Sequence, residues 1–236
     1  MRIDDLDEAA AGVALTVVRT TVSGNGNGAS DHDGIRVNET GEGDIVSTVR
    51  YSRFDANGGD GLELDERGSG DLDLVVSNSS FDRNGFQDPE DLEDGIDLDE
   101  RDDGTIWVNV TNVSVDGNAA QGLDFDEDDD GEMVAVVEKT TASGNGDSGI
   151  KIDENNDGGL SAELSNIVAV ANGDDNIRVK EDNDGDLAVL VAKTVSVNSA
   201  GFGLSVEQDD DGSGTLELQW VNLSNNEDGE LETEGL

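Results

Sequence analysis

The sequence contains no cysteine, a single proline and few aromatic side chains, which make up 3% of the 236 residues. Without cysteine the protein has neither a disulfide framework nor a thiolate metal site. Any hydrophobic core must therefore be assembled from Val, Leu, Ile and Ala. No apolar segment approaches the ~20 residues of a membrane span. The N-terminal segment lacks the apolar stretch of a signal peptide, so we expect a removed export signal or a piece of a longer protein.

Positive charge is also scarce, with 13 Lys and Arg against 57 Asp and Glu and a formal net charge of -44. Such a chain repels the phosphate backbone, which argues against a nucleic-acid partner. High net charge with few aromatic residues is typical of disordered chains, and it also suits proteins of high-salt habitats. A fold can be assigned only if the sequence contains a pattern that builds a core.

A segment of the form Gly-(Leu/Ile)-x-apolar-acidic-Glu-x-x-Asp-Gly supplies that pattern. Successive copies begin at Gly34, Gly61, Gly95, Gly122, Gly149, Asn176, Gly203 and Glu230. The interval is 27 residues except between Gly61 and Gly95, where it is 34 and predicts a loop insertion over 87–94. Repetition at a fixed period is typical of solenoids, whose stacked repeats bury a continuous core. We expect a single domain over 1–236 with an irregular first coil over 1–33.

Within each repeat, apolar residues alternate with polar ones, as in a strand with one buried face. Aligning the repeats gives columns of like side chains, one of which is Val37, Leu64, Leu98, Phe125, Ile152, Val179 and Val206. A third, less regular strand of the repeat contains Phe54, Phe81, Val115, Val170 and Val197. Three short strands per coil predict an all-β fold, a parallel β-helix with about 27 residues per coil.

An asparagine column precedes the first strand in six of the repeats, at Asn57, Asn84, Asn118, Asn145, Asn172 and Asn226. Asparagine tolerates left-handed backbone and can hydrogen-bond to the coils above and below. The pattern Asn-x-x-x-Gly-(Leu/Ile)-x-apolar resembles the right-handed parallel β-helix repeat proteins, a group that includes pectate lyases and related polysaccharide-active proteins. The resemblance implies a right-handed solenoid and is specific for fold, not for activity.

The turn after the first strand is strongly acidic in five consecutive repeats. Stacked coils lie ~4.8 Å apart, so each carboxylate lies over another. Two such charges repel by about 0.9 kcal/mol in bulk water and about 3.5 kcal/mol at an effective dielectric constant of 20. We therefore expect either bound cations or screening by high salt.

The spacing of the acidic residues favours a hard cation. The segments Asp126-x-Asp128-x-Asp130-Gly131 and Asp153-x-Asn155-x-Asp157-Gly158 match the first half of a calcium loop, whose alternate oxygens converge. The bidentate Glu expected six residues later is missing, so an adjacent coil would complete the site. We predict several Ca²⁺ ions, with candidate ligands Asp99, Glu100, Asp103, Asp126, Glu127, Asp128, Asp130, Asp153, Glu154, Asn155, Asp157, Glu181, Asp182, Asp184, Asp209 and Asp211. The alternative is a halophilic surface with no specific metal.

The outward positions of the first strand run from acidic to basic along the chain. Glycan-active β-helices place catalytic groups on such a face, and here Asp97 and Asp124 would hold Ca²⁺ against a uronate. Lys151, Arg178 or Lys180 would then abstract a proton. The competing interpretation is a set of cross-coil ion pairs, because this strand face lacks the aromatic platforms of sugar sites.

Together these observations predict a secreted or cell-surface module with a structural, adhesive or cation-binding role. Its expected partners are calcium ions and either a polysaccharide or the end of another solenoid. The runner-up is a calcium-dependent polysaccharide lyase or hydrolase acting on acidic glycans.

Overall fold

A computed structural model describes residues 1–6, 10–26, 32–90 and 92–236. Strands, turns and bends make up these residues, and the described ranges contain no helix. Consequently, they contain no helix that is long and apolar enough to cross a membrane. The all-β parallel solenoid expected from the repeat is confirmed. Residues 7–9 and 27–31 of the expected first coil and Asp91 of the expected insertion lie outside the described residues.

The first strands of successive coils form a nine-stranded sheet. In order, its strands are β1 (Arg2–Asp5), β4 (Ile35–Glu39), β7 (Leu62–Glu66), β9 (Ile96–Glu100), β11 (Leu123–Glu127), β14 (Ile150–Glu154), β17 (Ile177–Glu181), β20 (Phe202–Gln208) and β23 (Gly229–Glu234). Each strand pairs in parallel with the equivalent strand one coil away. From β4 to β23 the chain makes about seven turns of about 27 residues.

The second and third strands of the coils belong to one 14-stranded parallel sheet. The second strands are β2 (Val13–Val18), β5 (Ile45–Arg50), β8 (Leu72–Asp82), β10 (Ile106–Ser114), β12 (Met133–Glu138), β15 (Leu160–Ser165), β18 (Leu187–Ala192) and β21 (Gly214–Gln219). The short third strands are β3 (Thr21–Ser23), β6 (Arg53–Asp55), β13 (Thr141–Ser143), β16 (Val168–Val170), β19 (Val195–Val197) and β22 (Asn222–Ser224). β8 and β10 are long enough to serve as both second and third strand of their coils.

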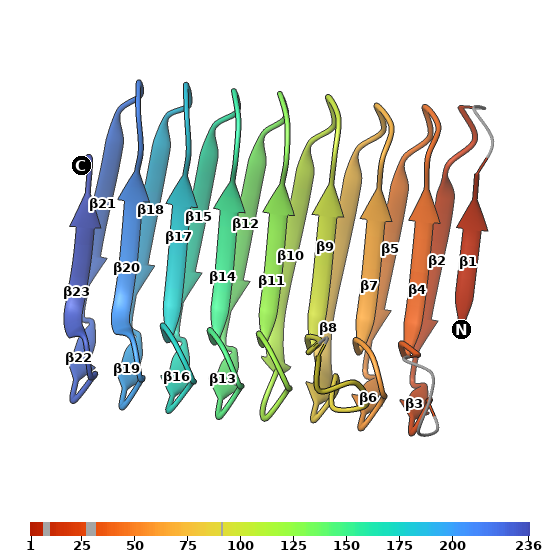
Figure 1. Cartoon of the computed structure of the whole chain (residues 1–236), viewed down its shortest axis with the longest axis horizontal. Coiled ribbons are helices and arrows are strands. Elements are labelled where there is room, and N and C mark those ends of the chain that lie inside the picture. Colours follow the sequence, from red (N-terminus) through yellow and green to blue (C-terminus); the bar gives the residue numbers. More distant parts are fainter. Residues whose placement is uncertain (7–9, 27–31, 91) are drawn as a thin grey trace.

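Figure 1 shows the nine-stranded sheet in front and the second strands behind it, with the short third strands below. The front strands run upward and the rear strands run downward, while successive coils advance to the left. This path is right-handed, as the resemblance to β-helix proteins implied. The chain between β8 and β9 is longer than its equivalents, which agrees with the insertion expected over 87–94.

The core lies between the two sheets and consists of the predicted apolar columns. Ile152 and its neighbours in the column are fully buried, and Phe54 stacks on Phe81 with ring centroids 4.6 Å apart. In the third strands the inner column continues through Ala142, Ala169 and Ser196, whereas Val170 and Val197 are only half-buried. The larger side chains face outward here because strand register, not side-chain size, decides the inner position.

The asparagine column forms a hydrogen-bonded ladder from Asn57 to Asn172, and Ser199 takes the place of an asparagine before Asn226. The amide of Asn118 donates to Oδ1 of Asn145 at 3.1 Å, and that of Asn145 donates to Oδ1 of Asn172 at 3.0 Å. The left-handed backbone expected at these asparagines occurs instead at the residue before each one, such as Ala56 with φ 55° and Arg83 with φ 60°. The ladder asparagines therefore act through their side chains.

Removing one ladder amide should destabilise the solenoid. Asn145 is buried, and its amide also donates to the carbonyl of Val115 at 3.0 Å. Asn145→Ala leaves several buried polar groups unpaired at about 1–3 kcal/mol each, so we expect a loss of at least about 2 kcal/mol in urea unfolding. The exposed Asn109 on β10 gives the control, and Asn109→Ala should change stability by less than about 0.5 kcal/mol. Equal losses in the two variants would contradict the ladder's role.

Candidate metal centres

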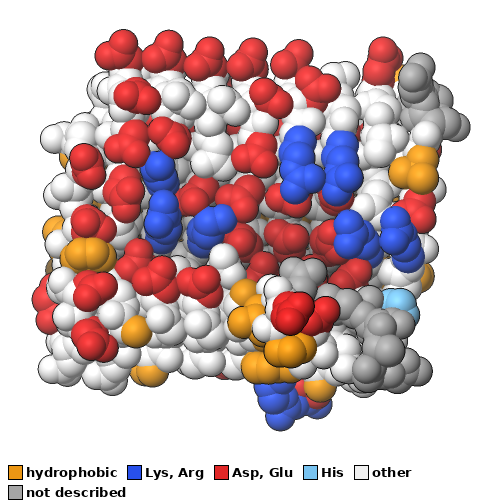
Figure 2. All heavy atoms as spheres, viewed as in Figure 1, with side chains coloured by type: hydrophobic (Ala, Val, Ile, Leu, Met, Phe, Trp, Pro, Cys, Tyr) orange, Lys and Arg blue, Asp and Glu red, His pale blue; other side chains and the backbone are white. Residues whose placement is uncertain are grey.

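The outward face of the nine-stranded sheet gathers most of the charge that could bind a ligand. Register aligns its two outward rows across the coils, as the sequence predicted. One row is Arg2, Arg36, Glu63, Asp97, Asp124, Lys151, Arg178, Ser205 and Glu232; the other is Asp4, Asn38, Asp65, Asp99, Asp126, Asp153, Lys180, Glu207 and Glu234. Figure 2 shows this face, with acidic side chains in its centre and Lys and Arg side chains grouped around them.

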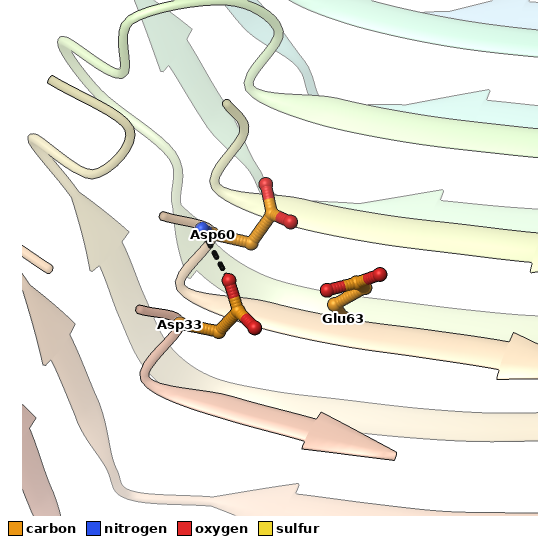
Figure 3. Close-up of side chains that lie close together, drawn as sticks. All are labelled: Asp33, Asp60 and Glu63. Atoms are coloured by element: carbon orange, nitrogen blue, oxygen red, sulfur yellow. Dashed lines mark hydrogen bonds between the residues drawn. The ribbon is translucent and has the colours of Figure 1, made fainter. Parts of the chain in front are cut away.

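The first close group of carboxylates on this face is Asp33, Asp60 and Glu63. Each offers one oxygen, and these three atoms lie within 4.8 Å of one another. Asp33 and Asp60 occupy the turn positions just before β4 and β7, and Glu63 is on β7; Figure 3 shows the three side chains together. The backbone N–H of Asp60 donates to Oδ1 of Asp33 at 3.2 Å. This first triad thus joins two adjacent coils.

Glu63 is the most informative member of the first triad. It is 6% exposed, and its Oε1 lies 2.8 Å from Nη2 of Arg36. Its Oε2 is buried and has no hydrogen-bond partner. Burial, reinforced by Asp33, raises the pKa of Glu63 to about 8 despite the opposing effect of Arg36. A carboxylate oxygen in this position lacks a positive partner.

The second triad consists of Asp94, Asp97 and Asp124, which also bring three oxygens within 4.8 Å. Asp94 stands before β9, Asp97 is on β9, and Asp124 is on β11, so this triad again joins two coils. Burial raises the pKa of Asp97, and the nearby Asp99, Asp94 and Asp124 raise it further. Burial also raises the pKa of Asp124 to about 7. Both triads therefore concentrate negative charge where water is scarce.

The cations of this face act as counter-ions. Nζ of Lys151 lies 2.9 Å from Oδ1 of Asp124 and 2.7 Å from Oδ1 of Asp126. Burial alone would lower the pKa of Lys151, but the surrounding aspartates outweigh it and raise the pKa above its usual value. The amine therefore stays protonated, which argues against its proposed role as a general base. The other two candidate bases are also paired, Arg178 with Asp153 and Lys180 with Asp182 and Asp209.

The predicted calcium ligands of the turns fall into three groups. On the outer face, Asp99, Asp126, Asp128, Asp153, Asp182 and Asp209 lie within 4 Å of Arg or Lys nitrogens, and Asn155 donates to Asp128. At the turn tips, Asp103, Asp130, Asp157, Asp184 and Asp211 are exposed. Among the described Asp, Glu and His side chains, only the two triads bring three ligand atoms of different residues within 4.8 Å, so calcium in these turns stays a prediction.

The third group is a buried glutamate column. The predicted Glu100, Glu127, Glu154 and Glu181 stack in it with Glu39 and Glu66, which the sequence analysis did not name; all six are 0% exposed, and the column ends at Gln208. The side chains turn back into their own turns, where the N–H of Gly68 donates to Oε1 of Glu66 at 2.9 Å and the N–H of Gly158 donates to Oε1 of Glu154 at 3.2 Å. Burial raises the pKa values in this column, to about 8 for Glu66, 10 for Glu100, 6 for Glu127, 9 for Glu154 and 7 for Glu181.

Comparison of the chain with protein-family models, with curated proteins and with solved structures finds no match. The assignment of a site therefore depends on the geometry of this molecule alone.

Sequence reasoning missed four of the six triad residues, namely Asp33, Asp60, Glu63 and Asp94. Asp33, Asp60 and Asp94 each precede the glycine at which a repeat begins, so they lie one position before the aligned repeat. The segments Asp60-Gly61-Leu62-Glu63 and Asp94-Gly95-Ile96-Asp97 share the same pattern, with two carboxylates three residues apart around an apolar residue. Extending the alignment by one residue would have found this signal.

The metal-free protein should lose stability as the pH rises. Raised pKa values mean that the folded glutamate column holds protons more tightly than the unfolded chain, so its contribution is complete below about pH 4.5 and falls as the pH passes from about 6 to 10. We expect a decrease on the order of a few kcal/mol in protein refolded from urea in the presence of EGTA, measured by urea unfolding from pH 5 to pH 9.5. Glu127→Gln, whose amide does not ionise, should weaken this dependence. If the stability of the metal-free protein increases with pH, the buried glutamates do not hold protons in the folded state.

Proposed function

We propose that this protein is a calcium-binding β-solenoid whose ions tie adjacent coils together, and that it serves outside the cell as a structural or adhesive module. The buried, unpartnered Oε2 of Glu63 within the first triad is the observation that carries the proposal. Arg36 pairs with Oε1 of this carboxylate, and a cation beside Oε2 would supply the partner that this second oxygen lacks.

The chemistry of the triads favours Ca²⁺ over other metals. Their side chains offer carboxylate oxygen only, which suits hard cations and not zinc or copper. Three carboxylates provide three to six oxygens, and Ca²⁺ accepts six to eight oxygens in flexible geometry, with water completing the shell. Mg²⁺ demands a tighter octahedron and holds its water more firmly.

The position of the triads supports a structural role. Each triad takes ligands from two neighbouring coils, so an ion there would resist separation of the coils as well as neutralise charge. Of the first triad, Asp33 lines a pocket together with His32, Arg36 and Glu93, and this pocket would give ions a route from solvent to the triad. Ca²⁺ sites of extracellular modules bind at about 10⁻⁴–10⁻³ M, and an affinity in this range would suit a role outside the cell. A polysaccharide or another solenoid end as a partner stays a prediction.

The lyase alternative has less support. It requires a neutral base beside the metal, whereas Lys151 is held protonated by three aspartates. The halophilic alternative requires only diffuse screening of the acidic face by salt, and it is separated from specific binding by the experiment below.

Calcium should stabilise the protein beyond its effect on ionic strength. Ca²⁺ at a hundredfold excess over its dissociation constant should add about 2.7 kcal/mol per site to the free energy of unfolding. We would measure thermal and urea unfolding of EGTA-treated protein with CaCl₂, MgCl₂ and KCl at equal ionic strength. Specific binding predicts the largest gain with CaCl₂, whereas equal gains with CaCl₂ and KCl would leave only a salt-screened surface.

Double variants in the second triad and at the turn tips, with one control, test where calcium binds. Asp97→Asn with Asp124→Asn should remove part of the calcium-dependent gain and, without calcium, should stabilise the fold by removing repulsion. The matched control is Asp102→Asn with Asp129→Asn, which removes the same charge from exposed positions outside both predicted sets. A third variant, Asp130→Asn with Asp157→Asn, tests the turn tips. If this variant alone abolished the calcium effect, the ions would bind in the turns and not in the triads.

A further inference from the structure

The glutamate column described above lies inside the turns of the solenoid and is separate from the triads on the outer face. Strand register places each glutamate directly over the next, so the carboxylates form a row along the solenoid axis. All six are 0% exposed. Water therefore does not solvate their charge.

Nothing positive in the described residues compensates this row. None of the ion pairs found there involves a glutamate of the column. Backbone N–H groups of the turns satisfy some of the oxygens, but several buried oxygens have no hydrogen-bond partner. They are Oε2 of Glu66, both oxygens of Glu100, both oxygens of Glu127, Oε2 of Glu154 and Oε1 of Glu181. The row therefore needs protons or cations between its members.

At the C-terminal end of the column, a hydrogen-bond donor lies between two successive coils and contacts a carboxylate. Gln208 takes the place of a glutamate there, and its amide donates to Oε2 of Glu181. A neutral donor thus replaces one negative charge and contacts the next carboxylate. It also shows that glutamine fits this position of the coil, which provides a conservative variant.

The distance between coils is compatible with calcium. Stacked coils lie ~4.8 Å apart, so carboxylates held at that spacing would place an ion midway at about 2.4 Å from an oxygen of each. Without an ion, neighbouring carboxyl groups share protons instead, as Glu100 does with Glu127 and Glu66. Ca²⁺ binds oxygen at about 2.3–2.6 Å, whereas Mg²⁺ requires about 2.0–2.1 Å. Main-chain oxygens are also at hand: the point where a Cβ of Gly158 would stand is 1.6 Å from the carbonyl oxygen of Gly131 and 2.8 Å from Oε1 of Glu154. The equivalent position at Gly131 is 1.7 Å from the carbonyl oxygen of Gly104 and 2.7 Å from Oε1 of Glu127.

We propose that the glutamate column is a second, interior metal site, in which Ca²⁺ ions lie between carboxylates of successive coils and share almost no water. Charge balance sets its capacity, because about three divalent ions neutralise six carboxylates. The site is sealed, so it is filled while the coils fold and not by diffusion into the finished solenoid. It does not depend on calcium at the outer triads.

Tb³⁺, which substitutes for Ca²⁺, distinguishes the two kinds of site by the water that it retains. The protein would be unfolded in urea with chelator, refolded with Tb³⁺ and excited directly, and the luminescence lifetimes would be compared in H₂O and D₂O. Ions in the column should form a class with few or no bound waters, and ions at the triads a class with several. Charge balance allows about two trivalent Tb³⁺ ions beside the six carboxylates, and Glu127→Gln leaves only five, so the class with few waters should shrink. The exposed Glu163→Gln is the control with the same charge change.

The opposite substitution gives an independent test. Gln208→Glu extends the column by one carboxylate, so it should increase the class of ions with few waters. The triad variant Asp97→Asn with Asp124→Asn should reduce only the hydrated class. If wild-type protein refolded with Tb³⁺ contains no ion with few waters, or if Glu127→Gln retains as many as wild type, the column holds protons only and the proposal is overturned. If wild-type protein instead contains ions with few waters but no hydrated ions, calcium binding at the outer triads is refuted while the proposal for the column is supported.

Discussion

Every feature of this protein depends on one constraint, the stacking of equivalent residues at the inter-strand distance. A repeat of about 27 residues returns each position to the same place on the next coil, so side chains of the same type stack on one another along the solenoid. For apolar side chains this is favourable, because each coil covers the core of its neighbour. For asparagine it is also favourable, because one amide can both donate and accept along the column.

For carboxylates the same stacking is unfavourable, and the protein meets this in three ways. At the turn tips, the aspartates are exposed to water, where repulsion is weak. On the outer face, Lys151, Arg101 and Lys180 lie among the acidic rows and neutralise part of them. In the glutamate column and the two triads, burial and crowding raise the pKa values, so protons or metal ions must take the place of side-chain cations.

The proposed calcium sites relate to the unusual composition of the chain. A chain with few aromatic residues has only a narrow core of aliphatic side chains, and ions that tie coils together would add cohesion that the core cannot supply. Calcium and protons compete for the same oxygens, so pH and calcium concentration should act on the same equilibrium. Stability of the solenoid would then depend on the solution around it more than on its core alone.

The sequence by itself determined the solenoid, its coil length, its insertion, the apolar columns and the outward rows, because all of these follow from a strict period and the alternation of a strand. It also identified four of the six glutamates of the column, Glu100, Glu127, Glu154 and Glu181, although as ligands of calcium in the turns. Tertiary structure alone decided which carboxylates are buried and which meet. Asp60 and Glu63 join Asp33 because a turn before one strand lies beside the next coil, and the glutamate side chains fold inward because turn N–H groups attract them. Period and residue type do not encode the direction in which a side chain leaves a turn, and that direction determines whether a carboxylate faces water, a lysine or another carboxylate.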